Sequence, residues 1–231
     1  MPTFSLHPRP SGPAEEMRFA DRTFGLWAWG SGKAWQPAQT GTHFGAIVSG
    51  PLTLTCDAGT FVLGAGMVFC VPGNLAFSGE GAAFGVTDRA YRGLFQIAGP
   101  MEAQGRLRYI DGCTDSLVIA PQVKGEPCLN FLHFPPGTDQ TRHTHPSFRA
   151  GLVLRGAGVC RLDDGDEPLL PGMIFHLPAG VRHAFRTTDG CMDVIAFHPD
   201  SDFGPEHDDH PMINRTLVDG LSANRIPAIR T

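Results

Sequence analysis

The segment Gly66-Met-Val-Phe-Cys-Val-Pro72 returns 106 positions later (172 − 66) as Gly172-Met-Ile-Phe-His-Leu-Pro178. The same offset places Gly45-Ala-Ile-Val-Ser-Gly50 over Gly151-Leu-Val-Leu-Arg-Gly156. One unbroken register that keeps its glycines and a proline indicates an internal duplication. The chain of 231 residues is therefore expected to contain two copies of one unit of roughly 100 residues, which is an ordinary domain size.

The repeated unit has the pattern of an all-β fold. Short apolar runs at residues 44–48, 51–55, 67–71, 152–154 and 192–197 are each bounded by Gly, Pro or Asp. Regularly spaced short strands with turn residues between them are typical of a sandwich or barrel. No apolar stripe is long enough for a regular helix, and at most residues 14–19 form a helical turn.

The boundary between the copies is expected just after Gly99-Pro100. We expect a first barrel at residues 1–105, a second barrel at residues 106–200 and an extended tail at residues 201–231. The tail carries enough apolar residues to pack on a neighbouring barrel or subunit.

The composition of the chain excludes some classes of partner and indicates where in the cell the protein is expected. The formal charge is −5, with no basic tract, so nucleic acid is not an expected partner. No apolar stretch reaches the roughly 18–20 residues that span a bilayer, and residues 1–16 lack the apolar core of a signal peptide. We expect a soluble cytoplasmic protein. Its six cysteines form no CxxC pair and are expected to be buried thiols.

Three histidines distinguish the second copy from the first. His143 and His145 lie two positions apart, so on a strand they point to the same face. His183 follows Pro178-Ala-Gly180, a turn that would start a strand near the first pair. They are either separate solvated histidines or a nitrogen cage for a divalent metal with open positions. At the 106-residue offset the first copy has Pro37, Gln39 and Phe77.

The second copy resembles the two sequence motifs of the cupin superfamily. The first motif reads Gly137, five residues, His143-Thr-His145, three residues, Arg149, six residues and Gly156. The second reads Gly172, five residues, Pro178-Ala-Gly180, two residues, His183, three residues and Thr187. Through the repeat, the resemblance extends to most of the chain and implies a bicupin: two tandem jelly-roll barrels, of which only the second has the metal ligands.

The resemblance implies that His143, His145 and His183 are the ligands of a divalent transition metal. The chain departs from the family at Arg149, which occupies the position of the usual Glu ligand. A guanidinium cannot ligate and stays protonated. Two interpretations follow. Arg149 binds an anionic group of a substrate that also coordinates the metal, or it turns away to pair with Asp163, Asp164 or Asp166.

Other residues near the motifs are candidates for a catalytic, ligating or structural role. We group Gln140 with Arg149 as a candidate catalytic residue. A fourth ligand would come from Gln140, Asp139, His133 or His176, whereas residues of these types are more commonly found at a rim or in a core. His43, at the position equivalent to Arg149, is expected to be structural, and Trp27, Trp29 and Trp35 are expected to be core. The segment His207-Asp-Asp-His210 is expected to be solvated.

The resemblance implies a metal-dependent small-molecule enzyme. Cupins with three histidine ligands include thiol dioxygenases and diketone-cleaving enzymes, so we expect a non-haem iron(II) dioxygenase, with manganese, zinc, nickel or copper as the alternative metals. The alternative functions are a non-redox metalloenzyme (hydrolase, lyase, decarboxylase or isomerase) and a non-catalytic binding barrel. The expected partners are an anionic small molecule and a second subunit in a homodimer.

Overall fold

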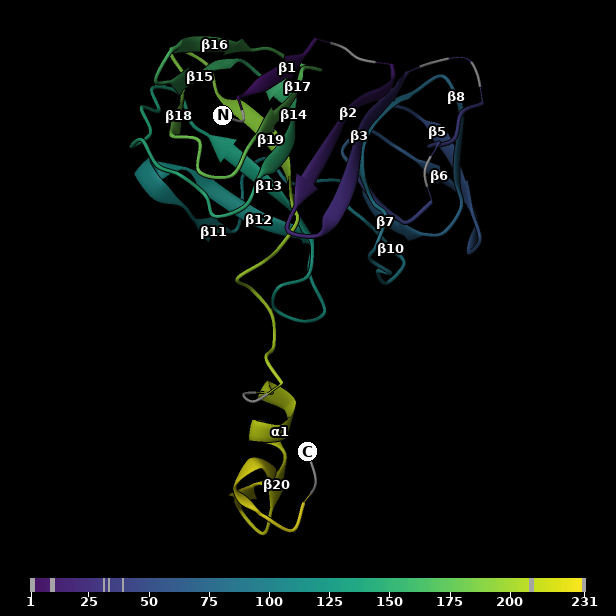
Figure 1. The fold of residues 1–231 in the computed structure, drawn as a ribbon, viewed down its shortest axis with the longest axis vertical. Coiled ribbons are helices and arrows are strands. Elements are labelled where there is room, and N and C mark those ends of the chain that lie inside the picture. The colour runs from purple at the N-terminus through teal and green to yellow at the C-terminus, as the bar shows by residue number, and fades with distance from the viewer. Residues whose placement is uncertain are drawn as a thin grey trace.

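Two β barrels lie side by side, and a narrow C-terminal arm extends away from them (Figure 1). The structure is a computed structural model that describes residues 3–8, 11–30, 32, 34–38, 40–207 and 210–229. Gln39, Asp208 and Asp209, named above, lie outside the described residues. The all-β fold of two tandem jelly-roll barrels, predicted from the strand pattern, the repeat and the cupin resemblance, is confirmed.

The first barrel consists of two antiparallel sheets. Their strand orders are β10-β7-β4-β9-β3-β2 and β6-β5-β8. The strands are β2 (Gly12–Phe19), β3 (Arg22–Gly30), β4 (Thr42–Ser49), β5 (Leu52–Cys56), β6 (Gly59–Leu63), β7 (Val68–Pro72), β8 (Leu75–Gly79), β9 (Ala82–Asp88) and β10 (Gln96–Ala98). The predicted helical turn at residues 14–19 is wrong, because β2 pairs along its length with β3 and this pairing outweighs local preference.

The second barrel has the same arrangement. Its sheets have the strand orders β1-β17-β14-β19-β13-β12-β11 and β16-β15-β18. The strands are β1 (Ser5–His7), β11 (Leu107–Arg108), β12 (Thr114–Ile119), β13 (Cys128–Phe134), β14 (Arg149–Gly156), β15 (Gly158–Leu162), β16 (Gly165–Leu169), β17 (Ile174–Leu177), β18 (His183–Arg186) and β19 (Met192–His198). A 3₁₀ turn covers Ile110–Gly112.

The strand β1 crosses from the first part of the chain to the second barrel. It pairs with β17, and Glu15 of β2 accepts hydrogen bonds from His7 (3.0 Å) and His176 (2.7 Å). The 106-residue repeat did not predict that the N-terminal strand pairs with the second barrel. The division of the chain near residue 105 stays a prediction.

The repeat is visible in the hydrogen bonds and packing of both barrels. Gly66 donates to the carbonyl of Ile47 at 2.9 Å, and Gly172 donates to that of Val153 at 2.8 Å. The same packing explains why both copies have a glycine at this position. A Cβ on Gly45 would clash with the Phe69 ring, and a Cβ on Gly151 would clash with the Phe175 ring. Each glycine lets an aromatic ring lie directly on the neighbouring strand.

The two barrels share one aromatic core. The Phe24 ring lies 5.1 Å from the Phe148 ring and 5.8 Å from the Phe197 ring, and Phe44 lies 5.2 Å from Phe197. Alternate residues of the same strands face the barrel interiors, where Val153, Phe175 and Val194 belong to a separate cluster. One face of each large sheet therefore packs against the large sheet of the other barrel. The opposite face of each sheet lines the interior of its own barrel.

The arm contains α1 (Pro211–Arg215), β20 (Leu217–Val218), β21 (Leu221–Ser222) and a 3₁₀ turn, Ala223–Arg225. Within the described part of the chain, no helix is long and apolar enough to cross a membrane.

Substituting Phe24→Ala tests the shared core. Phe24 is fully buried, so removal of its ring should lower the free energy of unfolding by about 3–5 kcal/mol. Urea denaturation measures the loss. As a control, Val62→Ala, at a side chain that is 71% exposed, should change the value by less than about 0.5 kcal/mol. A loss below about 1 kcal/mol for Phe24→Ala would contradict a core shared between the barrels.

Candidate metal centre

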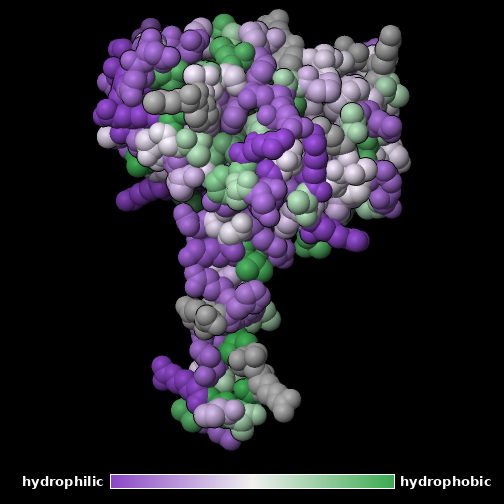
Figure 2. Space-filling view, viewed as in Figure 1, coloured by the Kyte–Doolittle hydropathy of each residue, from purple (hydrophilic) through white to green (hydrophobic). Residues whose placement is uncertain are grey.

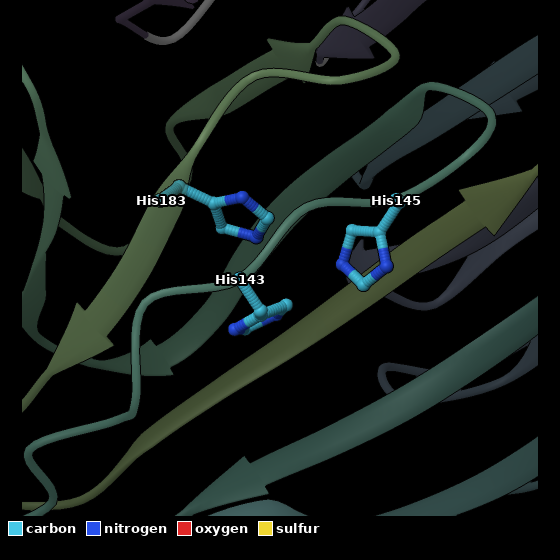
Figure 3. A group of neighbouring side chains, drawn as sticks. All are labelled: His143, His145 and His183. Atoms are coloured by element: carbon cyan, nitrogen blue, oxygen red, sulfur yellow. The ribbon is translucent and has the colours of Figure 1, made fainter.

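The rings of His143, His145 and His183 converge inside the second barrel (Figure 3). Their centroids lie 4.5 Å (143–183), 4.9 Å (143–145) and 5.1 Å (145–183) apart. One nitrogen from each ring lies within 4.8 Å of the other two. The structure thus brings together the three histidines that the motifs predict as ligands.

The backbone of His143 and His183 sets this geometry. Each residue donates its N–H to the carbonyl of the other, at 2.9 and 3.0 Å, and Gly180 donates to His145 at 2.9 Å. His183 begins β18, as expected from the preceding turn. His143 and His145, however, do not lie on a regular strand: His143 makes an isolated bridge, and a bend after His145 separates the pair from β14. Two short backbone contacts, and not strand alternation, orient this pair.

Hydrogen bonds on the far side of two rings favour metal binding. The Nδ1–H of His143 donates to the Thr141 carbonyl (2.8 Å), and that of His183 donates to the Val181 carbonyl (3.0 Å). Each bond leaves Nε2 unprotonated, which is the form that ligates. The Nε2 of His183 is buried and has no hydrogen-bond partner. A metal ion would satisfy this nitrogen, so these residues fit the ion that the family implies.

The environment of His145 and His183 favours the neutral form of these two rings. Burial, followed by the charge of Arg149 and the two other rings, lowers the pKa of His145 to about 3. Burial lowers the pKa of His183 to about 4, although its bond to Val181 opposes the shift. At neutral pH these two imidazoles need not release a proton before binding a cation.

Arg149 lies at the start of β14 and is half-buried. One of its nitrogens donates to the Ser147 hydroxyl at 2.7 Å and to the Phe148 carbonyl at 2.9 Å, and the Ser147 hydroxyl donates to Asp200. Its Nε is buried without a partner. It alternates with Gly151 and Val153, so it faces the barrel interior.

The acids considered as partners for Arg149 are used elsewhere or lie apart. Asp163 pairs with Arg142, and Asp166 lies 3.9 Å from Arg161. Asp164 makes no ion pair with Arg149 among the described residues. Arg149 therefore does not turn outward to these three acids, and its nearest acidic contact runs through Ser147 to Asp200.

His198 is a site residue that the motifs do not identify. It ends β19 on the face that Val194 and Ala196 present to the barrel interior. Burial, and then the charges of Arg149 and His145, hold its pKa well below the usual range. Strand alternation over residues 192–198 was the signal that could have found it, since His198 falls outside both motifs.

A polar patch continues along the same inner wall. Burial raises the pKa of Tyr109, and the nearby Arg149 opposes that shift. Burial also raises the pKa of Asp115, although the Asn130 amide donates to both of its oxygens at 2.9 Å. The barrel therefore holds a cation, a phenol and a carboxyl in a largely apolar enclosure.

The other sequence candidates lie outside the histidine group. Gln140 is buried; its carbonyl accepts from the Phe185 N–H at 3.1 Å and its amide faces the Cys113 sulfur at 3.8 Å. Asp139 pairs with Arg161. His133 is bonded to Asp193, and His176 to Glu15. Of the residues described, only His143, His145 and His183 form such a group.

In the first barrel, aromatic residues occupy the place that the histidine group has in the second barrel. Trp35 and Phe77 exchange backbone hydrogen bonds at 3.0 and 2.7 Å, as His143 and His183 do. Trp35, and not Pro37, is therefore the counterpart of His143, because the connecting loop differs in length between the copies. Phe77 lies 6.3 Å from Trp35 and 5.5 Å from Trp29, and these rings occupy the position of the ligands.

His43, the counterpart of Arg149, is fully bonded. Its Nε2–H donates to the Gly73 carbonyl at 3.0 Å and its Nδ1 accepts from the Thr87 hydroxyl at 2.8 Å. The Trp27 indole donates to the same hydroxyl at 2.9 Å. The expectation that His43 and the tryptophans are structural is confirmed.

Comparison with known proteins agrees with this class of double-barrel fold. Residues 130–198 match the family model of the cupin domain. A putative glyoxylate-induced protein from Pseudomonas aeruginosa is 16% identical over 88% of this chain and 82% of that chain, with a TM-score of 0.61. A cupin 2 conserved barrel domain protein from Leptotrichia buccalis is 12% identical over 86% and 89%, with a TM-score of 0.59.

Salicylate 1,2-dioxygenase from Pseudoaminobacter salicylatoxidans, with gentisate, is 12% identical over 77% of this chain and 68% of that chain, with a TM-score of 0.55. At such identities these similarities show the fold alone. No curated protein sequence matches the chain. Residues 130–198 therefore form a cupin domain, and the two barrels together have the fold of a bicupin.

The pH dependence of stability tests the buried state of His43. Burial lowers the pKa of His43 from 6.5 to about 4. The unfolded chain therefore binds a proton between these pH values that the folded barrel does not, and stability is lost as pH falls through this window. The substitution His43→Gln should reduce the pH slope of the unfolding free energy there by up to about 1.4 kcal/mol per pH unit. Urea denaturation across this range measures it.

The control for His43 is His207→Gln, at an exposed side chain. It should leave the slope as in the wild type. An unchanged slope in His43→Gln would mean that His43 is protonated in the folded barrel.

Substituting His145→Ala tests the ligand group. Removing one of three ligands should reduce bound metal from about one ion per chain to less than about a tenth. Elemental analysis measures the metal, and circular dichroism should show an unchanged fold. His207→Ala, outside the group, should retain the metal. Unchanged metal content in His145→Ala would show that the ligands lie elsewhere.

Proposed function

We propose that the chain is a non-haem iron(II) dioxygenase that acts on a small anionic substrate in the second barrel. One observation carries the proposal. In the described part of the chain, the two buried side-chain atoms without a hydrogen-bond partner are His183 Nε2 and Arg149 Nε, and both belong to this barrel. Buried polar atoms are rarely left unpaired. A metal ion for the first atom and a substrate anion for the second would satisfy both.

The three histidines would hold the metal. Neutral imidazoles leave the ion its full charge, and a bound iron(II) would supply dioxygen chemistry at positions shared with the substrate. The bonds from Nδ1 of His143 and His183 to backbone carbonyls fix two of the rings. Gln140, through its bond to Phe185, steadies β18 next to His183, so we assign it a positioning role.

Arg149 would bind and orient the substrate. The positive charge of Arg149 lies near His145, and no carboxylate ligand balances the charge of a bound metal. An anion between the guanidinium and the metal ion is therefore favoured. The bonds to Ser147 and Phe148 hold the guanidinium in place, while its Nε is buried and available to an acceptor. Tyr109 and His198 would flank the bound molecule, and the apolar wall around them excludes water.

A second candidate is a non-redox metalloenzyme, and Asp115 is the observation that favours it. Hydrolysis or isomerisation needs an acid or base near the metal, and no motif position supplies one. Asp115 faces the interior, and burial raises its pKa. Carboxyl groups that act as general acids or bases commonly have pKa values raised in this way. Zinc, manganese or nickel would serve such a reaction.

Metal content and oxygen uptake distinguish the candidates. The protein purified without added metal or chelator should contain iron, and after iron(II) loading small chelating acids or diketones should stimulate oxygen uptake. Zinc, manganese or nickel without uptake would favour the non-redox enzyme. Absence of bound metal would leave a binding barrel and refute both enzymatic functions.

Substituting Arg149→Glu tests the anion site. A carboxylate at this position supplies the fourth ligand and removes the positive charge, so metal binding should tighten while the KM of an anionic substrate rises at least about tenfold. Isothermal titration with the metal and oxygen-uptake kinetics measure the two effects. The control Arg92→Glu makes the same charge change at an exposed residue of the first barrel and should alter neither. If neither quantity changes in Arg149→Glu, Arg149 does not act at the metal.

A further inference from the structure

Among the described residues of the C-terminal arm, the hydrogen bonds to the second barrel lie at its root. Gly125 donates to the Ser201 carbonyl at 2.7 Å, Lys124 donates to the Pro205 carbonyl at 3.2 Å, and the Lys124 ammonium pairs with Glu206 at 2.6 Å. These bonds fix residues 201–206 against the loop at residues 123–126, which projects from the body on the same side (Figure 1). The arm is therefore directed away from its own barrels.

The end of the arm exposes apolar side chains that it cannot bury itself. The helix α1, the hairpin β20–β21 and the 3₁₀ turn contact one another, beyond the barrels in Figure 1. A unit of this size is too small for a core of its own. Apolar residues appear at the arm's end in Figure 2. At this end the exposed fractions are 73% for Met212, 64% for Leu217, 41% for Val218, 56% for Leu221 and 36% for Ile229.

The body of the same chain carries an open, mainly apolar groove, whose lining also includes Glu102 and Arg106. It has a volume of about 370 Å³ and lies between β7 and β10 of the first barrel and β12 of the second. Leu107, 56% exposed, stands at its rim. The strands β10 and β11 beside it lie on the side of the body from which the arm extends (Figure 1). The apolar lining residues include Val68, Pro100, Met101, Leu117, Val118 and Phe131.

We propose that the arm of one chain packs into this groove of a second copy, and that two copies exchange arms around a two-fold axis. A second copy is the fitting partner because every chain carries both an arm and a groove, and because the root of the arm holds it away from its own groove. Reciprocal exchange of this kind is an isologous, closed arrangement.

The available area suits a stable dimer. With roughly 200 Å² for each large apolar residue, the exposed fractions at the end of the arm give about 500 Å² per arm. Two arms and the two surfaces that receive them would bury on the order of 2,000 Å² in total. Stable interfaces bury about 1,200–2,000 Å².

Disruption of each surface tests the exchange. Light scattering coupled to size-exclusion chromatography at micromolar concentration should give the wild-type chain twice its mass of 24.8 kDa. The double substitution Leu217→Asp/Leu221→Asp in the arm and the single substitution Leu107→Asp at the groove should each weaken dimerisation at least about 100-fold and give monomers. The control Leu170→Asp, at a 46% exposed residue of the second barrel that does not line the groove, should remain dimeric.

Mixing the two disrupted variants distinguishes exchange from other interfaces. The arm variant keeps an intact groove and the Leu107→Asp variant keeps an intact arm, so together they should form a heterodimer with one of the two contacts. Circular dichroism should show that each is folded. Truncation after His207 provides a second arm variant if the double substitution misfolds. A monomeric wild type, a dimer that survives loss of the arm, or no heterodimer from the mixture would overturn the proposal.

Discussion

The candidate site depends on one pair of backbone hydrogen bonds, between His143 and His183. This pair joins an irregular loop to the first residue of β18 and places two rings 4.5 Å apart before any metal is considered. Side chains on a loop lose much conformational freedom on being gathered. The paired backbone bonds hold the two residues in place, and the bonds to the Thr141 and Val181 carbonyls then fix the orientation of the rings.

The duplication shows that this backbone element does not require a metal. In the first barrel Trp35 and Phe77 make the same paired bonds, and aromatic stacking fills the space between them. His43 finds two hydrogen-bond partners where Arg149 leaves Nε unpaired. One barrel therefore has a satisfied interior that serves stability. The other keeps unsatisfied polar atoms, as expected of a barrel that binds a ligand.

Much of the fold and half of the site could be predicted from the sequence. The strands around residues 44–48 and 192–197 follow from local patterns, and the two copies follow from the 106-residue register. The resemblance to the cupin motifs identified the three histidines, although their orientation comes from backbone contacts and not from strand alternation. Other features required the assembled molecule. His198 reaches the site by a strand outside the motifs, and the helical turn expected at residues 14–19 is a strand because β3 offers it a partner.

The sequence by itself determined the duplicated all-β fold and the identity of the histidine cluster, because glycines, turns and apolar alternation act over a few residues and recur in register. Only the tertiary structure decided where Arg149 directs its guanidinium, that Trp35 stands in for His143, and that the arm leaves its apolar side chains exposed. These depend on distances between segments far apart in the chain. Loop length and strand pairing set such distances, and no local pattern records them.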